Sequence, residues 1–384
     1  MIIKNAIITI TILLGCYSSA SDNIVPNEIL LYYSDNYNDL RNKFLTAARL
    51  SGGRIENYRN PVDGPGGEAL YIDVACFGVN NPKTILVLGS GTHGVEGFAG
   101  SAIPTGLLSQ GIVSTLAPHV GLVMIHAINP YGVAHLRRVN EDNVDLNRNF
   151  LDHSKLHPSN EGYEHLANAI APQSLSLWND TTSLIKLLSY RFLHGTTELR
   201  LAISGGQYTH PKGLFYGGHS PTWSNKTVNE IARRHLLKAE RVVVIDFHTG
   251  LGSYGNAELI MNVNKDSPAY QRARQWWGDL VTSTVTGESV STPLSGTLKL
   301  AFDQILPDSE VSAVSLEFGT LPSKEVLWRL RSENWLQHHG GSEHPDSKQI
   351  KNDLLRAFYP DDKEWKFDIW RQSSKIVKTV IDRL

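Results

Sequence analysis

The fold class is decided by the stretch Asn225-Lys-Thr-Val-Asn-Glu-Ile-Ala-Arg-Arg-His-Leu-Leu-Lys-Ala-Glu240 and by Arg241-Val-Val-Val-Ile-Asp-Phe-His248, which follows it at once. Val228, Ile231 and Leu236 recur at helical spacing, so the first part predicts a helix. The run of β-branched residues in the second part predicts a buried strand. A helix that leads directly into a buried strand is the repeating unit of an α/β sheet with helices on both faces.

Three further apolar runs have the length and composition of buried strands, namely Thr84–Leu88, Leu122–Ile128 and Ala313–Phe318. We therefore predict one α/β domain over residues 21–384, with a central mixed, mostly parallel β-sheet flanked by helices. Residues 151–225 are richer in polar and turn-forming residues, which indicates a polar insertion that leaves the sheet.

The overall charge excludes one class of partner. The 384 residues contain 36 Lys and Arg against 38 Asp and Glu, a formal net charge of -2. A chain this close to neutrality offers no basic surface for a phosphate backbone, so we expect no nucleic acid among its partners.

The first twenty residues have the pattern of a signal peptide. Lys4 precedes an uncharged, mostly apolar run from Ala6 to Gly15, which is about half the length that spans a bilayer. We therefore expect export to the periplasm or the cell exterior, and no transmembrane helix. Cleavage after Ala20 and cleavage before Cys16 are both open, and the second would make a lipoprotein with a lipid anchor on that cysteine.

Polar side chains follow each of the four predicted strands. His93 and Glu96 come after the first, and Arg137, Arg138, Asn147 and Arg148 come after the second. His248 ends the third strand and Glu317 lies at the tip of the fourth. Ligands of open α/β sheets bind beyond the carboxyl ends of the strands, so these groups are expected to converge.

His93, Glu96 and His248 form a candidate metal site. Two histidines and one glutamate are a common zinc ligand set that leaves a fourth position open for water. The alternative for His93 and Glu96 is that the histidine caps a helix and the carboxylate is solvated. Asp246 lies two residues before His248 on the same strand face, from which a carboxylate can orient the imidazole.

Glu317 is the candidate general base. It lies among apolar neighbours in Val314-Ser-Leu-Glu-Phe-Gly319, which predicts a raised pKa for its carboxyl group. Zinc lowers the pKa of a bound water to about 7, so a nearby carboxylate can take its proton and later return it to a departing amine. The alternative is a structural ion pair with an arginine.

The ordered set of these motifs resembles the zinc carboxypeptidase (M14) superfamily. The nearest resemblance is to its DUF2817-like branch, which is related to aspartoacylase and succinylglutamate desuccinylase. The segments that carry it are Gly91-Thr-His-Gly-Val-Glu96, Asp145-Leu-Asn-Arg-Asn-Phe150, Asp246-Phe-His-Thr-Gly250 and Leu316-Glu-Phe-Gly-Thr320.

The resemblance implies a carboxypeptidase-like fold and a role for each residue in the motifs. It implies one Zn²⁺ held by His93, Glu96 and His248, with Glu317 as general base. Asn147 and Arg148 match the pair that binds the free carboxylate of a substrate. Arg138, with Arg137 as the rival, matches the arginine that polarises the scissile carbonyl. Candidates for the tyrosine that closes over the substrate are Tyr208, Tyr216 and Tyr254.

These features together predict a zinc-dependent hydrolase of carboxypeptidase type. It would cleave an amide bond next to a free carboxylate, and its substrate would be a small peptide. One alternative is an N-acyl amino acid deacylase that uses the same metal site. The other is a binding protein that contains zinc but has no activity.

Overall fold

The computed structural model describes residues 25–384, so the predicted leader and Cys16 lie outside the described residues. The described chain forms an eight-stranded sheet in the order β1-β2-β4-β3-β5-β8-β6-β7. The strands are β1 (Arg54–Arg59), β2 (Tyr71–Phe77), β3 (Thr84–Ser90), β4 (Val120–His126), β5 (Arg241–Tyr254), β6 (Ala257–Met261), β7 (Val281–Ser283) and β8 (Glu310–Gly319). Four of the seven neighbouring pairs are parallel and three are antiparallel. The prediction of a mixed, mostly parallel sheet is confirmed.

The four predicted strands are adjacent and parallel to one another, in the order β4-β3-β5-β8. All four differ from their predicted bounds: β3 ends two residues later, and β8 begins three residues earlier and ends one residue later. β4 begins and ends two residues earlier, because the chain leaves the sheet at Ala127. β5 continues past His248 to Tyr254, through an irregular stretch in which Gly250 and Gly252 have positive φ. The apolar pattern stops at Phe247, so it could not reveal this extension.

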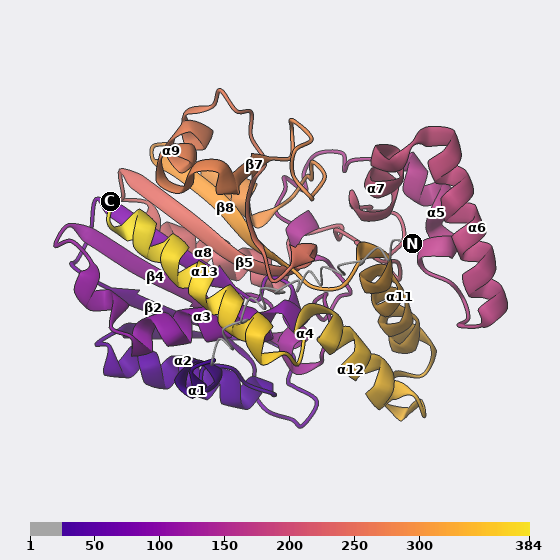
Figure 1. The fold of residues 1–384 in the computed structure, drawn as a ribbon, viewed down its shortest axis with the longest axis horizontal. Coiled ribbons are helices and arrows are strands. Elements are labelled where there is room, and N and C mark those ends of the chain that lie inside the picture. Colours follow the sequence, from indigo (N-terminus) through magenta and orange to yellow (C-terminus); the bar gives the residue numbers. More distant parts are fainter. Residues whose placement is uncertain (1–24) are drawn as a thin grey trace, which may run out of the picture.

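Helices cover both faces of the sheet. In Figure 1, α13 crosses the front of the sheet together with α3 and α2. The helices are α1 (Asn27–Leu30), α2 (Tyr37–Leu50), α3 (Gly97–Ser109), α4 (Pro130–Ala134), α5 (Glu161–Ile170), α6 (Leu177–His194), α7 (Thr196–Ser204), α8 (Trp223–Leu236), α9 (Pro268–Trp277), α10 (Leu298–Ile305), α11 (Ser323–His339), α12 (Ser347–Phe358) and α13 (Lys363–Ile381). The prediction of a sheet flanked by helices is confirmed, and the helix predicted from Asn225 is α8.

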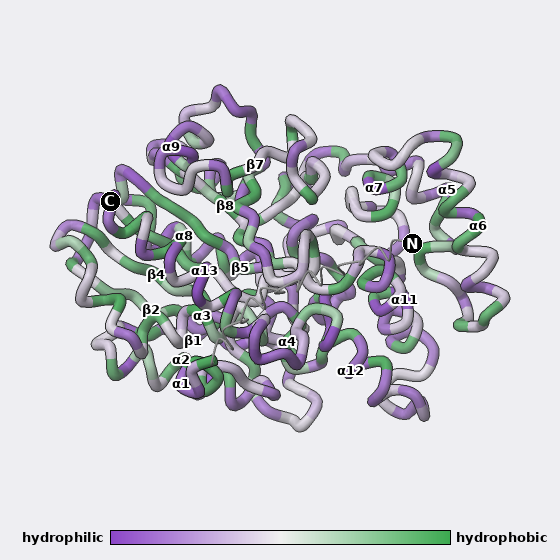
Figure 2. Tube along the Cα trace, in the orientation of Figure 1, coloured by the Kyte–Doolittle hydropathy of each residue, from purple (hydrophilic) through white to green (hydrophobic). Residues whose placement is uncertain are grey.

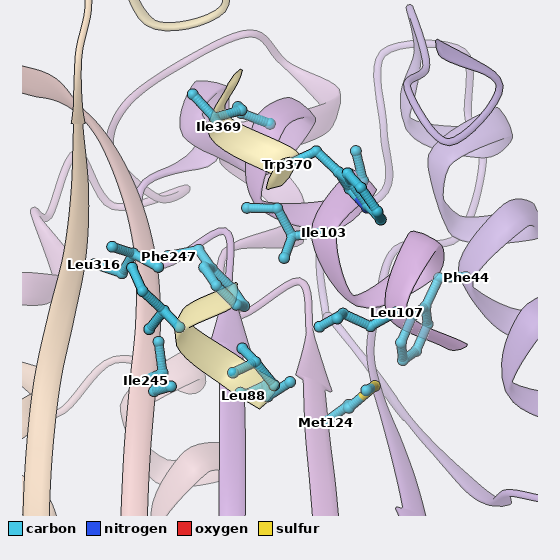
Figure 3. Packing of buried hydrophobic residues seen from close by; sticks show 14 of the residues in the cluster. Phe44, Leu88, Ile103, Leu107, Met124, Ile245, Phe247, Leu316, Ile369 and Trp370 are labelled. Carbon is cyan, nitrogen blue, oxygen red and sulfur yellow. The ribbon is translucent and has the colours of Figure 1, made fainter. Parts of the chain in front are cut away.

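The alternation of side chains along β5 assigns each residue to one of two cores. Ile245 and Phe247 pack with α3 and α13, where Ile103 and Trp370 lie (Figure 3). Val242 and Val244 face the opposite way and pack with α8 and α10. Because successive side chains point to opposite faces, His248 belongs to the α8 and α10 face. Burying each of these large side chains stabilises the fold by about 1.5–3 kcal/mol.

A third core lies beyond one end of the sheet. It joins α5, α6 and α7 to α11 and α12, which Figure 1 shows grouped on the right. Three helices thus lie within residues 151–225, the predicted insertion. Val95, between two of the predicted metal ligands, belongs to this core and is fully buried. The helical group therefore packs against the turn that carries His93 and Glu96.

The hydrophobic residues are concentrated in the strands of the sheet, between the two layers of helices. Figure 2 shows hydrophobic residues along most of β4 and β5, which lie inside the molecule. Cys76 is buried in β2. Within residues 25–384, no helix combines the length and apolar character that crossing a membrane requires.

Candidate metal centre

The turn that follows β3 carries the first two candidate ligands. His93 precedes a short 3₁₀ turn at Gly94–Glu96, and α3 begins directly after it. The backbone N–H groups of Gly94 and Val95 donate to the carbonyls of Arg138 and Arg137, at 3.0 Å each. A Cβ atom on Gly94 would lie 2.1 Å from the backbone of Gly132, so only glycine permits this close approach. The H-G-x-E pattern thus also holds the backbone of Arg137 and Arg138 against this turn.

His93, Glu96 and His248 come together and could hold a metal ion. One ligand atom from each residue lies within 4.8 Å of the others, and all three side chains are buried. The Nδ1 atom of His93 is 2.9 Å from Oε1 of Glu96, and Nδ1 of His248 is 2.9 Å from Oε2. The alternative of a solvated Glu96 is wrong, because this side chain is only 2% exposed.

The outer nitrogen of each imidazole faces a second carboxylate. Nε2 of His248 lies 2.6 Å from Oδ2 of Asp246, which also accepts a hydrogen bond from Thr92. Nε2 of His93 lies 3.0 Å from Oδ1 of Asp145. A histidine that donates its Nε2–H to a carboxylate leaves the Nδ1 lone pair free for a metal. Nη2 of Arg138 also lies 2.9 Å from Nε2 of His93. In both rings Nδ1 faces Glu96, where a metal would lie, and the donor set fits zinc.

The charges of this cluster favour an ionised glutamate. Burial alone would raise the pKa of Glu96, but the facing imidazoles of His93 and His248 outweigh it and hold that pKa below its usual range. Burial lowers the pKa of His248, whereas the carboxylates of Asp246 and Glu96 raise it further, with a net rise. The raised pKa favours the protonated His248 ring, so a divalent cation that binds at Nδ1 would have to displace that proton.

Glu317 lies beside the candidate metal ligands. It is the direct partner of His248 in the parallel pairing of β5 and β8, and it is 7% exposed. Burial and the charge of Glu96 raise its pKa to about 8, although His248, the Leu251 N–H and Arg138 act in the opposite direction. Its Oε1 accepts a hydrogen bond from the backbone of Leu251 at 3.0 Å. The pKa shift predicted from its apolar neighbours is thus present.

The two adjacent arginines point to opposite sides. Arg138 faces the candidate ligands, with Nη1 2.9 Å from Oε1 of Glu96 and Nε 3.2 Å from Oδ2 of Asp145. Arg137 turns away and forms a buried ion pair with Glu333 of α11 at 2.8 Å. The structure therefore brings Arg138 into the site and excludes Arg137 from it.

Asn147 and Arg148 lie on the turn that begins at Asp145. The Oδ1 of Asn147 accepts the N–H of Leu298, the first residue of α10, at 2.9 Å. Arg148 donates to the backbone carbonyls of Asn147 and Ser204, and it is 3% exposed. Its Nε has no hydrogen-bond partner within residues 25–384, so this guanidinium retains a free donor. Binding of a substrate carboxylate by this pair stays a prediction.

Comparison of the sequence with models of known protein families assigns the chain to a family. A family model described as "Protein of unknown function (DUF2817)" matches residues 33–372. The chain belongs to the DUF2817 family. This confirms the branch to which its motifs point. No curated protein was found to match it.

Several solved structures resemble this DUF2817 protein at low identity. A carboxypeptidase A from Helicoverpa armigera is 12% identical with a TM-score of 0.46, over 89% of this chain and 73% of that one. An aspartoacylase family protein from Mesorhizobium loti is 14% identical with a TM-score of 0.36, over 74% and 66%. A succinylglutamate desuccinylase from Chromobacterium violaceum is 15% identical with a TM-score of 0.36, over 86% and 76%. Likenesses at these TM-scores carry no weight for function.

The tyrosines of this DUF2817 protein lie in different surroundings. The hydroxyl of Tyr208 donates to the carbonyl of Arg148 at 2.7 Å, so this ring lies next to the predicted carboxylate anchor. Tyr216 is buried. The hydroxyl of Tyr254, which is 49% exposed, donates to Asp362 at 2.7 Å. Tyr208 therefore packs next to Arg148, whereas within residues 25–384 no hydrogen bond joins the side chain of Tyr216 or Tyr254 to that residue.

One carboxylate of the site was missed in the sequence. Asp145 is fully buried and contacts both His93 and Arg138, and their charges lower its pKa well below the usual range against the effect of burial. The Asp-Leu-Asn-Arg motif contained this residue, yet no partner histidine lies near it in sequence. The only feature of the sequence that could have indicated a role for Asp145 was its position two residues before Asn147.

Proposed function

We propose that this DUF2817 protein is a zinc-dependent hydrolase of carboxypeptidase type, which cleaves an amide bond next to a free carboxylate. The observation that carries the proposal is the cluster of His93, Glu96 and His248, whose two rings face Glu96 with Nδ1. A zinc ion held there would supply Lewis acidity and lower the pKa of water into the neutral range.

Glu317 is the group that moves the proton. Its position beside His248 favours uptake of a proton from the attacking water. Because its pKa is raised to about 8, the ionised form can take that proton, and the protonated form can then pass it to the departing amine.

Arg138 and the pair Asn147–Arg148 bind the substrate. The guanidinium of Arg138 lies at Glu96, where donors can stabilise negative charge on a carbonyl oxygen. Arg148 can offer its free Nε–H to a carboxylate, and a charge-assisted hydrogen bond of this kind fixes the substrate end next to the scissile bond.

Replacing Glu317 with Gln tests this proposal. We expect kcat/KM to fall by about 10²–10⁴-fold, because the amide cannot take a proton. Zinc content measured by elemental analysis should stay that of the wild type. The control is Glu310→Gln at the other end of β8, where the side chain pairs with Arg241 at the surface.

The substrates should include peptides with free and amidated C-termini, and N-acyl amino acids. Turnover of the free peptides is the expected result. Selective turnover of N-acyl amino acids would instead identify a deacylase. Unchanged activity of Glu317→Gln would refute the assignment of the base, and no hydrolysis despite bound zinc would indicate a binding protein.

A further inference from the structure

Lys299 in α10 is a buried cation without an acidic partner. The residue is 8% exposed, and its Nζ donates to the backbone carbonyl of Ile260 at 3.0 Å. Within the described chain, no carboxylate oxygen lies within 4.0 Å of this ammonium group. A buried charge is normally paired, because transfer out of water is costly.

Other lysines in the interior follow that rule. Lys366 of α13 is 9% exposed and lies 3.1 Å from Asp361. Lys351 of α12 lies 2.6 Å from Glu333. Lys299 differs from both in having only a carbonyl oxygen as its partner, so two of its three N–H donors remain available.

The register of the sheet places Lys299 close to the catalytic carboxylate. Its partner Ile260 pairs with Ser315 of β8, and Ser315 pairs with Asp246 of β5. Glu317 lies two residues beyond Ser315 along β8. It is on the same face of the sheet as Ser315, at a distance of roughly 6–7 Å along the strand. Burial lowers the pKa of Lys299 to about 8, against the opposing charges of Asp246 and Glu317, in keeping with their proximity.

The same helix end also touches the predicted carboxylate anchor. Leu298, which precedes Lys299, donates its N–H to Oδ1 of Asn147 at 2.9 Å. This hydrogen bond, from a backbone N–H to a side-chain oxygen, attaches the start of α10 to Asn147 one residue before Lys299. A substrate whose free carboxylate lies at Asn147 and Arg148 would have its neighbouring side chain close to α10.

We propose that Lys299 binds an anionic side chain on the residue that carries the free carboxylate, so that substrates ending in glutamate or aspartate are preferred. This inference rests on the proposed function. An incoming carboxylate would give the buried ammonium its missing partner through a charge-assisted hydrogen bond. A neutral side chain of the same shape would leave the ammonium unpaired, and a site built around such a group discriminates strongly against it.

A matched pair of substrates tests the inference. Two N-acylated dipeptides that differ only in a terminal Glu or Gln are compared on the full zinc-loaded chain, and N-acetyl-Glu and N-acetyl-Gln form a parallel pair. We expect kcat/KM to favour Glu by roughly tenfold or more, as for the loss of one buried charge-assisted hydrogen bond. Equal or faster cleavage of the Gln substrate by the wild type would overturn the inference.

Variants then assign the preference to one side chain. Lys299→Met should bring the Glu/Gln ratio close to one, and Lys299→Arg should retain part of it because the charge remains. The control is Lys366→Met, which removes an equally buried lysine on another helix and should keep the wild-type ratio. Thermal unfolding shows whether each variant is folded, and a folded Lys299→Met that keeps the preference would contradict the assignment.

A binding measurement separates this inference from the proposed function. Calorimetry compares free L-glutamate with L-glutamine on the same proteins, with and without added zinc. If no substrate is hydrolysed, the proposed function fails, while tighter binding of glutamate that is lost in Lys299→Met still supports the anionic site. Equal binding of the two amino acids to the wild type would overturn it.

Discussion

At the scale of single residues, the imidazole of His248 lies between two carboxylates. Its Nδ1 faces Glu96 at 2.9 Å and its Nε2 faces Asp246 at 2.6 Å. Asp246 is itself held by the hydroxyl of Thr92 at 3.0 Å. The position of Asp246 therefore fixes both the orientation of the ring and the nitrogen that carries the proton.

Asp246→Asn is expected to weaken metal binding without abolishing it. The amide can still accept the Nε2–H but no longer carries the charge that makes the ring a better ligand. We expect the zinc dissociation constant to rise about 10–100-fold, measured by competition with a chelating dye. The control is Asp73→Asn, which removes a buried carboxylate that pairs with Arg41. An equal loss of affinity in the control would contradict a specific role for Asp246.

Some residues of the site could be predicted from the sequence, and others could not. His93 and Glu96 follow a predicted strand. His248 and Glu317 lie at the ends of two others, and the parallel sheet brings all four together. Arg137 and Arg138 are neighbours of the same type, so only the path of the backbone separates the one in the site from the one paired with Glu333. Lys299 stands in Leu-Lys-Leu-Ala-Phe, where a lysine normally lies on the exposed face of an amphipathic helix.

At the scale of elements, α10 is a short helix that supports the site from one side. Its residues Phe302 and Ile305 pack into the core formed with α8 and β5. The backbone N–H of its first residue, Leu298, donates to the side-chain oxygen of Asn147. The packing of α10 thus holds both the predicted carboxylate anchor and Lys299 in place.

Phe302→Ala is expected to lower the free energy of unfolding by about 3–5 kcal/mol, because it leaves a cavity under α10. Leu237→Ala, just after α8 and 51% exposed, should change it by no more than about 0.5 kcal/mol. Denaturant unfolding of both variants measures the difference. Similar values for the two would show that α10 is not packed as described.

The elements that could be predicted are those with a strong apolar pattern. β3, β4, β5 and β8 and the helix α8 all carry such a pattern and form the centre of the fold. The region of α5, α6 and α7 does not. α6 is largely exposed, with Trp178 and Phe192 at 75% and 90%, so its apolar residues do not mark a buried face. Its helices pack against α11 and α12, a contact that no local pattern reveals.

At the scale of the whole molecule, the order of strands brings distant residues into one site. β3, β5 and β8 are neighbours, so the residues that follow or end them share one edge of the sheet. The α8 and α10 face supports the site from one side, and the group of α5, α6, α7, α11 and α12 packs against Val95 at the turn after β3. The candidate ligands are therefore buried although they come from separate segments of the chain.

Metal content tests this account most directly. Elemental analysis of the purified, zinc-reconstituted wild type should find one zinc ion per chain, and Glu317→Gln should match it. His248→Ala should lose most of that zinc, because two protein ligands hold the ion far more weakly than three. A folded His248→Ala chain with full zinc occupancy, or a reconstituted wild type with none, would contradict the metal centre on which the proposed function depends.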